Sequence, residues 1–556
     1  MKISQIIVFA WVIITPVILR AGTEPKYYDY VARQPWKAAN HTVEGRDWSL
    51  PDWVKPAPCS NIVTAIKTTD AKFPGNKTIR FNIRWNEVEP VEGKYHFQRF
   101  LDTLDAMQRR GIEFAELHVR GCVWGTNYYK KDAQGNYKVF RRTKGTTPAW
   151  LHNVYKIPLK EGFIMKNVNP PFSVVNIDMY DDVFIDKYCK FIRALGASGI
   201  FSHPIIKKAY IQYDSHYSRG EEGNGPERNS PNKPKFDRVY RTYAEALGEN
   251  VSKCMSVVGW YGDNLPDVIA MGFGQRNGFG EMYLAQLDNP QFGMSIDERG
   301  YIITDEEYAP IKEKRAWGEE NEEYDPEFLP RYGPFESFPH RYREASLSLL
   351  VMRRNSIWDQ NGGVTLDPHL TAFVGLELGR DVYDAPDIWC ELRESYIKRR
   401  SNKTETPVKN FERWLLQRDD FGTHTTPTRK VEHGTKGIIP TGLYRRVYIK
   451  GKEYDYTARK GKKIGFYIDK RFLDGYNGNF AIKLTYYDNT DFNVCYWTSK
   501  GTKTCHVRGT GSDREMTVTL IVRDLAKARS KEFDLWVESP DSVELSMARV
   551  IKCDEQ

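Results

Sequence analysis

The stretch TIRFNIRWNEVEPVEGKYHFQRFLDTLDAMQRRGIEF (residues 78–114) decides the fold, because it holds a complete strand–turn–helix unit and the start of the next strand. Residues 78–85 form a short run of branched and aromatic side chains, which is typical of a buried strand. After the turn, apolar residues recur at helical spacing until Gly111 ends the helix. The apolar residues on that helical face are Phe97, Phe100, Leu101, Leu104 and Met107.

The same alternation of short apolar runs and amphipathic helices continues as far as about residue 414. The other strand-like runs are 112–119, 206–214, 255–262, 267–274, 311–319 and 355–360, with 61–69 as the candidate for an eighth. Repeated strand–helix alternation predicts a parallel sheet covered by helices. At this length an α/β fold of the (β/α)8 TIM-barrel type is favoured over an open sheet.

The last hundred residues have a different pattern of apolar and polar residues. Segments such as NFAIKLTYYD and EMTVTLIVRD alternate apolar and polar residues, and no helical segment of any length separates them. Short strands with turn residues between them predict an antiparallel β-sandwich. The expected division is a signal peptide (1–22), a catalytic barrel with an N-terminal extension (23–420), a linker (421–452) and a β-sandwich accessory domain (453–556).

The composition excludes a disordered or fibrous chain. Of 556 residues, 40% are hydrophobic and 28% charged, as in ordinary globular proteins. Trp, Tyr and Phe together reach 13%, which suits sugar binding because flat rings lie against the apolar face of a pyranose. The net charge of +8 is compatible with an anionic substrate. Nucleic-acid binding proteins carry a concentrated basic stripe; none is predicted for this chain, and no nucleic-acid partner is expected.

The N-terminus is typical of a secretory signal peptide. Lys2 precedes an apolar run from Ile6 to Leu19, and small residues follow at Ala21 and Gly22. This run is shorter than the ~20 residues that cross a bilayer. The chain is therefore expected to be secreted or periplasmic, with no membrane span.

Two cysteines flank a predicted hairpin in the sequence VCYWTSKGTKTC. Cys495 and Cys505 lie symmetrically about Lys500 and Gly501, so opposed positions on the two strands would bring them within disulfide range. A bond and two buried thiols both remain open at this point.

Several reaction classes lack their motifs. The chain has no G-x-G-x-x-G followed by a nucleotide-binding unit, no G-x-S-x-G elbow and no H-E-x-x-H. The cysteines form no C-x-x-C pair. No cofactor and no metal are expected.

Two acidic clusters follow strand-like runs. Glu221 and Glu222 come a few residues after the run 206–214, and Glu319 and Glu320 end the run 311–319. Two strand runs separate the clusters, so strands four and seven would place them across the mouth of a barrel. Two carboxylates that flank a sugar are what glycosidic bond hydrolysis requires.

Other polar and aromatic residues at strand ends are candidates for substrate binding, because Arg and His suit hydroxyl, carboxylate or sulfate groups and Trp suits stacking. They are Arg84, Trp85, His118, Arg120, Asp214, His216, Trp260, Arg276, Asn277, Trp317 and Trp358. Glu87 and Glu89 are instead expected to shape the turn before Pro90.

The segment 79–114 resembles the clan A glycoside hydrolases, and among them the family 42 β-galactosidases. Their pattern W-x-x-x-E-P-x-x-G-x-Y-x-F is matched here from Trp85 to Phe97, and TTPAWL (146–151) is also similar. The segment LTYYDNTDFNVCYW resembles the sandwich modules of bacterial polysaccharide-degrading barrels. Family 42-like β-carrageenases and other marine galactan hydrolases share these features.

The resemblance implies a retaining mechanism, with Glu221 or Glu222 as the acid/base and Glu319 or Glu320 as the nucleophile. The clan usually has Asn-Glu at the acid/base position, whereas this chain has Gly-Glu-Glu, so the choice within that pair stays open. The implied substrate is a galactose-rich polysaccharide, sulfated or not, or its oligosaccharides.

Two other functions remain open. A glycan-binding protein on the same scaffold would keep the aromatic residues without a working carboxylate pair. A polysaccharide lyase would need a tyrosine or histidine base, for which His118 and His216 are the candidates.

Overall fold

The computed structural model describes residues 41–48, 61–64, 78–166, 168–213, 225–256, 264–277, 292–320, 347–359, 368–398, 405–432, 454–525 and 532–553. The structural statements below concern these residues. No helix among them is long and apolar enough to cross a membrane.

Eight parallel strands form one sheet. They are β2 (Asn61–Thr64), β3 (Thr78–Arg84), β4 (Phe114–Arg120), β9 (Ile206–Gln212), β10 (Cys254–Ser256), β11 (Gly274–Asn277), β14 (Trp317–Glu320) and β15 (Ser356–Asp359). Their order in the sheet is β2-β15-β14-β11-β10-β9-β4-β3, so the first strand in the chain pairs with the last. β2 also lies beside β3. This is the strand order of a barrel, but the described residues show no hydrogen-bonded ladder between β2 and β3, and closure stays a prediction.

Two of the parallel strands lie further along the chain than expected. Residues 267–270, expected in a strand, belong to helix α8 (Leu265–Ala270), and β11 follows it. Likewise α10 (Ala309–Lys312) occupies the start of the run 311–319, and β14 occupies its end. A short apolar run has no period of its own, so it does not distinguish a buried strand from a short buried helix.

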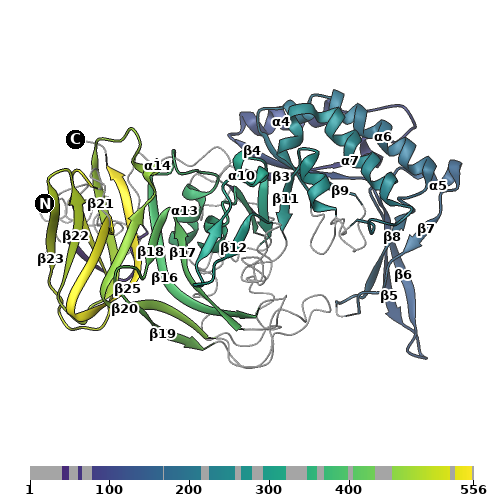
Figure 1. The fold of residues 1–556 in the computed structure, drawn as a ribbon. Helices are drawn as coiled ribbons and strands as arrows, with labels where there is room; N and C mark the ends of the chain where they lie inside the picture. The colour runs from purple at the N-terminus through teal and green to yellow at the C-terminus, as the bar shows by residue number, and fades with distance from the viewer. Residues whose placement is uncertain are drawn as a thin grey trace, which may run out of the picture.

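Helices cover one face of the parallel sheet (Figure 1). The helices whose buried residues share the core of this sheet are α3 (Trp85–Val88), α4 (Gln98–Arg109), α5 (Ala149–Tyr155), α6 (Asp182–Ala197), α7 (Lys233–Leu247) and α8. The other described helices are α10, α13 (Pro368–Glu377) and α14 (Lys470–Leu473), and Phe373 of α13 and Phe472 of α14 pack with residues of the antiparallel part of the chain. α6 begins at Asp181, whose carboxylate accepts hydrogen bonds from the backbone N–H groups of Val183 (2.9 Å) and Phe184 (3.2 Å). This cap satisfies donors that the first turn of a helix otherwise leaves unpaired.

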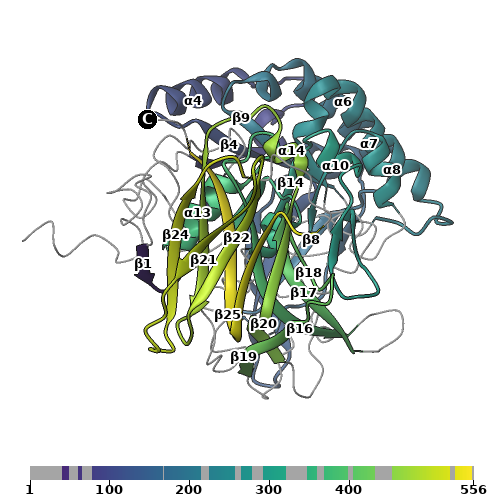
Figure 2. The ribbon, with the colours of Figure 1, turned by 60° about the vertical axis from the view of Figure 1, so that its left-hand side comes forward.

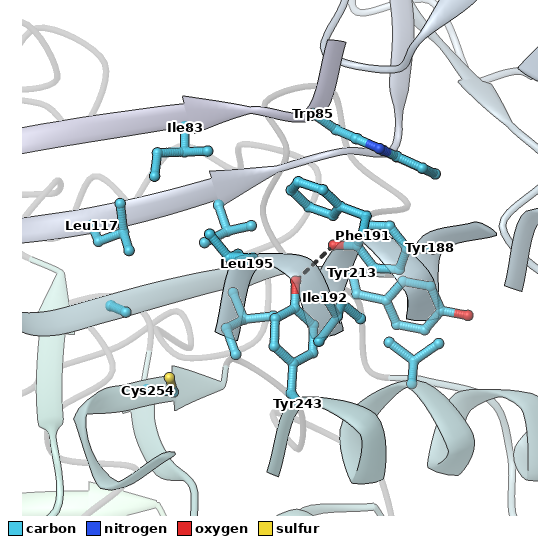
Figure 3. Packing of buried hydrophobic residues seen from close by; sticks show 14 of the residues in the cluster. Ile83, Trp85, Leu117, Tyr188, Phe191, Ile192, Leu195, Tyr213, Tyr243 and Cys254 are labelled. Atoms are coloured by element: carbon cyan, nitrogen blue, oxygen red, sulfur yellow. Dashed lines mark hydrogen bonds between the residues drawn. The ribbon is translucent and has the colours of Figure 1, made fainter. Parts of the chain in front are cut away.

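Aromatic packing holds these helices on the sheet. Trp85, directly after β3, packs against Phe191 and Tyr188 of α6, with ring centroids 5.2 Å apart in each pair (Figure 3). Ile83 of β3 and Leu117 of β4 belong to the same cluster. The hydroxyl groups of Tyr188 and Tyr243 share a hydrogen bond of 2.9 Å between α6 and α7. The polar atoms of the rings are thereby satisfied within an apolar core.

A smaller antiparallel sheet follows β4 directly. Its order is β6-β5-β8-β7, with bounds β5 (Val123–Lys131), β6 (Tyr137–Lys144), β7 (Leu159–Glu161) and β8 (Phe172–Ile177). It extends away from the helices and from the parallel sheet (Figure 1). A separate two-stranded ribbon consists of β12 (Met294–Ile296) and β13 (Ile302–Thr304).

The third large unit is an antiparallel sheet of eleven strands (Figure 2). They are β1 (His41–Glu44), β16 (Asp387–Lys398), β17 (Glu405–Arg413), β18 (Leu415–Arg418), β19 (Thr426–Glu432), β20 (Tyr454–Ile468), β21 (Asn479–Tyr487), β22 (Phe492–Thr498), β23 (Gly501–Val507), β24 (Glu515–Val522) and β25 (Leu535–Cys553). β25 pairs with β22 near its start and with β21 and β16 further along.

The boundaries of this unit differ from the expected ones. Its strands begin at Asp387 rather than near residue 453, and β19 (426–432) lies inside the expected linker and pairs with β20. β1, expected in an extension of the barrel, pairs with β24. The strands in this part of the chain carry charged residues that pair inside the protein, such as Glu412 and Arg418 (2.8 Å), and buried charged residues obscure the apolar–polar alternation of a strand.

Buried contacts join the antiparallel sheet to the helical part of the chain. Trp48, Phe373 and Trp389 belong to one hydrophobic cluster that includes residues of both parts. In the same region the buried guanidinium of Arg413 donates to the carbonyl oxygens of Leu350 and Glu377, each at 2.9 Å. The two parts therefore share a core.

The structure also settles the cysteine hairpin. β22 and β23 pair as expected, but Cys495 lies opposite Thr504 and Cys505 lies opposite Val494. The turn contains two residues, since Thr498 pairs with Gly501, and a shift of one position moves a side chain to the other face of the hairpin. Both cysteines are free thiols.

Candidate active site

The face of the parallel sheet opposite the helices is lined by polar residues. Because side chains alternate along a strand, residues in register across β3, β4 and β9 fall into rows. From the amino to the carboxyl ends of the strands, the three rows are Arg80–Glu116–Lys208, Asn82–His118–Tyr210 and Arg84–Arg120–Gln212. The alternate positions, such as Ile83, Leu117 and Ile211, belong to the core under the helices.

An ion network occupies the two inner rows. Glu116 lies 2.6 Å from Nε2 of His118 and 3.3 Å from Nζ of Lys208, and all three side chains are buried. Burial opposes the charge on Glu116, but Lys208 and His118 hold the pKa of its carboxyl below the usual range. Burial, helped by the positive charge of Arg80, lowers the pKa of His118 to about 3.

The hydrogen bonds fix the protonation of His118. Nη2 of Arg80 lies 3.4 Å from Nδ1, and a guanidinium only donates, so Nδ1 accepts and Nε2–H donates to Glu116. Both ring nitrogens are therefore engaged by protein groups, and the ring is buried. In this state His118 presents no nitrogen to a ligand, either as a sugar contact or as the base of a lyase.

The outermost row carries two adjacent cations. Arg84 ends β3 and is exposed, with its guanidinium 3.2 Å from Glu87. Arg120 ends β4 directly beside it and is half-buried. This row is where the sheet meets the loops at the carboxyl ends of the strands, the place where parallel α/β folds build their sites.

Trp85 and Glu89 form a structural turn. Glu89 accepts hydrogen bonds from Nε1 of Trp85 and from the backbone N–H of Gly93, both at 2.7 Å. Gly93 has a φ of +75°, a conformation that favours glycine. Trp150, from the TTPAWL segment, packs edge-on against Trp85 and donates to the Glu89 carbonyl at 3.1 Å. The two stretches that carry the sequence resemblance therefore meet in one turn.

Neither of the described candidate tryptophans offers a face to a sugar. Trp85 is fully buried between the aromatic residues of α6 and Trp150. Trp317 is also fully buried, with the Arg354 guanidinium 4.2 Å from its ring centroid and Tyr308 packed against it. In this structure both rings therefore support the sheet rather than present a stacking platform.

One acidic cluster lies on a strand of the parallel sheet, and the other follows a strand of this sheet in the sequence. In chain order β9 is the fourth parallel strand and β14 the seventh, and β10 and β11 lie between them in the sheet. Glu319 is in register with Asn277 and Ile357, and Glu320 is in register with Trp358. These positions are at the carboxyl end of the sheet, as expected for Glu319 and Glu320.

The remaining candidates are not placed. Asp214, His216, Glu221, Glu222 and Trp260 lie outside the described residues. For Arg276, Asn277, Glu319, Glu320 and Trp358 the structure describes strand position alone. Among the described residues, no group of three or more His, Cys, Asp or Glu side chains is arranged to hold a metal ion.

The sequence reasoning overlooked Arg80, Glu116 and Lys208. A signal was available, since TIRFNIR has polar residues at every second position and FAELHVR does so from Glu116 onward. Period-two alternation predicts a strand with one polar face. Parallel strands are usually apolar on both faces, so polar side chains were expected at the strand ends and not along the strands.

Several solved structures align with this chain at low sequence identity and low TM-score. No protein-family model matches the chain, and no curated protein matches it in sequence. Among solved structures, an exo-β-1,4-mannosidase from an Opitutaceae bacterium is 14% identical, over 55% of this chain and 49% of that one, with a TM-score of 0.29. A β-galactosidase from a Rahnella species is 13% identical, over 54% of this chain and 51% of that one, with a TM-score of 0.32.

A third solved structure aligns over more of the chain. Endo-glycoceramidase II from a Rhodococcus species is 11% identical, over 81% of this chain and 89% of that one, with a TM-score of 0.30. The chain spans about half the length of the mannosidase and the galactosidase. Each of the three names denotes an enzyme that cleaves glycosidic bonds. At these identities and scores no family is assigned, and the family 42 resemblance stays a prediction.

Proposed function

We propose that this protein is a retaining glycoside hydrolase that cleaves β-glycosidic bonds in a galactose-rich, sulfated or carrageenan-like polysaccharide or its oligosaccharides. The observation that carries the proposal is the position of the two acidic clusters relative to the parallel strands. Glu319 and Glu320 end the seventh parallel strand, and Glu221 and Glu222 follow the fourth in sequence. Carboxylates at the carboxyl ends of these two strands would flank a sugar bound over the sheet.

In the proposed mechanism the two carboxylates have different tasks. The glutamate after the fourth strand protonates the leaving oxygen while the one on the seventh strand attacks the anomeric carbon, and water then hydrolyses the glycosyl-enzyme. Glu319 and Glu320 are consecutive strand residues, so they occupy positions of opposite parity. We therefore expect one glutamate of that pair, and not both, to be the nucleophile.

The proposed setting is outside the cytoplasm. The apolar segment that follows Lys2 would direct export of the enzyme. A polysaccharide substrate is too large to enter the cytoplasm, so the exported enzyme would meet it in the medium or the periplasm.

The test is an activity screen of the purified protein. Neutral and sulfated galactans and their oligosaccharides are incubated with the enzyme, and new reducing ends are measured. Hydrolysis of one substrate class, with the anomeric configuration retained in the first product, would support the proposal. Binding without release of reducing ends from any substrate would favour a glycan-binding protein instead.

Variants then assign the roles. Glu319→Gln and Glu320→Gln are made separately, with Glu249→Gln as a control, since Glu249 is exposed at the opposite, amino end of β10. One of the two β14 variants should lose several orders of magnitude in kcat while still binding substrate, and the control should retain full activity. Full activity in both β14 variants would show that the nucleophile lies elsewhere.

A further inference from the structure

The net positive charge of the chain is concentrated in the small sheet that follows β4. Residues 123–177, here called the basic sheet, contain nine Lys and Arg and two acidic residues. Its net charge of +7 accounts for nearly all of the +8 of the whole chain. The expectation that the sequence lacks a concentrated basic region is therefore wrong for this segment.

Most of these cations form no ion pair with an acidic residue in the part of the chain that the structure describes. Among the described residues, Lys138 pairs with Asp132 at 3.1 Å and Lys160 pairs with Asp178 at 2.8 Å. The cations of the basic sheet that form no ion pair with a described residue are Lys130, Lys131, Arg141, Arg142, Lys144, Lys156 and Lys166. β6 is an edge strand, and from Lys138 to Lys144 each of its residues is exposed.

Protection of a sheet edge does not explain this charge. Charged residues of either sign keep an edge strand from pairing with another chain. Here Lys130 and Lys138 are directly opposite each other in the β5–β6 register, a like-charge pair that destabilises the hairpin. Seven unpaired cations with almost no carboxylates among them are instead the pattern of a surface that meets negative charge.

The rings of the basic sheet hold cations in place. The Arg141 guanidinium lies 4.1 Å from the Tyr128 ring centroid, and Nζ of Lys130 lies 4.6 Å from that of Phe140. Proteins bind single-stranded nucleic acids by stacking the bases on the open faces of aromatic side chains. Here each of these two rings has a cation over one face, so the rings position point charges, which suits sulfate or carboxylate groups on a sugar chain.

The basic sheet is attached beside the candidate active site. Its base at Gly145 and Thr146 accepts hydrogen bonds from the side chain and backbone of Asn86, both at 2.9 Å, two residues after Arg84. β5 begins three residues after Arg120. A polymer bound along the basic sheet would therefore continue toward the carboxyl ends of β3 and β4 (Figure 1).

We infer that the basic sheet binds a stretch of an anionic polysaccharide outside the catalytic site. The choice of a polysaccharide as the polyanion rests on the proposed function, whereas the choice of a negatively charged partner rests on the sheet alone. The eight residues of β6 extend over about 26 Å, enough to follow several sugar units.

Binding of the full chain to three polymers tests this inference. They are a sulfated galactan, an unsulfated galactan and a single-stranded DNA of similar length, each titrated at several salt concentrations. A triple variant Lys130→Ser, Lys138→Ser, Arg141→Ser removes cations from the basic sheet. The control Arg109→Ser, Lys190→Ser, Arg193→Ser removes the same charge from exposed positions on α4 and α6.

The wild-type chain should bind the sulfated galactan most tightly. The basic-sheet variant should lose at least about tenfold in affinity, and its slope of log affinity against log salt should fall by roughly two. The control should stay within about twofold of wild type. Circular dichroism and Tm of both triple variants show whether they fold. Equal loss in the two variants, no loss in the basic-sheet variant, or equally tight binding of DNA would overturn the inference.

Hydrolysis separates this inference from the proposed function. The basic-sheet variant should cleave a short neutral oligosaccharide as the wild type does, and an inactive Glu319→Gln or Glu320→Gln variant should keep its affinity for the sulfated polymer. Polymer binding without hydrolysis of any substrate contradicts the proposed function alone. Hydrolysis with polymer binding that does not depend on the basic sheet contradicts this inference alone.

Discussion

Replacement of Glu89 by alanine should destabilise the turn between β3 and α4 by several kcal/mol. Glu89 is buried, and its two carboxylate oxygens accept the Trp85 Nε1–H and the Gly93 N–H at 2.7 Å. Alanine leaves both donors without their acceptor. The buried Trp85 donor without a partner costs about 1–3 kcal/mol, and the hydrogen bond of the exposed Gly93 N–H contributes about 0.5–1.5 kcal/mol, so the expected loss is about 2–4 kcal/mol.

The isosteric variant Glu89→Gln gives a sharper test of the same hydrogen bonds. Its amide keeps one oxygen for one donor but turns an NH2 group toward the other, so we expect a loss of about 1–3 kcal/mol. The neighbouring Glu92→Ala is the control, because Glu92 is exposed and its ion pair with Lys187 should be worth less than about 1 kcal/mol.

Urea unfolding followed by far-ultraviolet circular dichroism measures the three free energies of unfolding. Hydrogen exchange at the Gly93 amide reports on the turn directly, and exchange there should accelerate in Glu89→Ala and stay unchanged in Glu92→Ala. If Glu89→Ala and Glu92→Ala lose the same stability, or if the Gly93 amide stays protected in Glu89→Ala, the hydrogen bonds of Glu89 do not hold this turn.

Three further predictions concern other parts of the molecule. The folded pKa of His118 is about 3 and its unfolded pKa is near 6.5, so stability present above pH 6.5 is lost as the pH falls toward 3. Urea titrations between pH 6.5 and 5 should show a loss of up to about 1.4 kcal/mol per pH unit from this group, and His118→Gln should flatten the slope. An equal slope in both proteins would contradict the neutral, buried histidine. Cys495 and Cys505 should both be alkylated when the protein is unfolded without reductant, and reductant should leave Tm unchanged; blocked thiols would show a bridge. Arg413→Ala should cost about 3–5 kcal/mol in thermal or urea unfolding, because it leaves a buried carboxylate and several carbonyl oxygens unpaired; a loss below about 1 kcal/mol would refute this.

Periodicity in the sequence was enough to find the parallel strands but not all of their limits. The branched runs at 78–85, 112–119 and 206–214 correspond to β3, β4 and β9. The run 267–274 gave a wrong limit, because its first four residues belong to helix α8. A run of four apolar residues fits either element, and packing against the neighbouring strands decides between them.

The roles of the candidate site residues depended on burial, which a single sequence does not report. Glu89 shapes the turn at Pro90, as expected, through its hydrogen bonds to Trp85 and Gly93. Trp85 directly follows the last residue of β3, as expected, whereas Trp317 is the first residue of β14 and not near its carboxyl end; both rings are buried in packed cores. The sequence shows which residues of a strand share a face, because they alternate along the strand. It does not show which face the helices cover, because that depends on the assembled sheet.

Register was the feature least accessible from the sequence. The hairpin of Cys495 and Cys505 was identified from alternating residues and a turn, but a two-residue turn instead of a symmetric one about Lys500 places the thiols on opposite faces. The energy difference between such turns is small and local, whereas the pairing of β22 with β25 fixes the register over the whole strand.

Local pattern established the elements of this protein: parallel strands with helices between them, an antiparallel C-terminal part, and acidic pairs after the fourth and seventh parallel strands. These features depend on side-chain periodicity, which each segment carries alone. Long-range packing established the shared core of the two large parts, the buried network around Glu116 and the basic sheet beside Arg84 and Arg120. Those features arise from residues far apart in the chain. The contacts that stabilise them form only once the strands that carry these residues lie side by side.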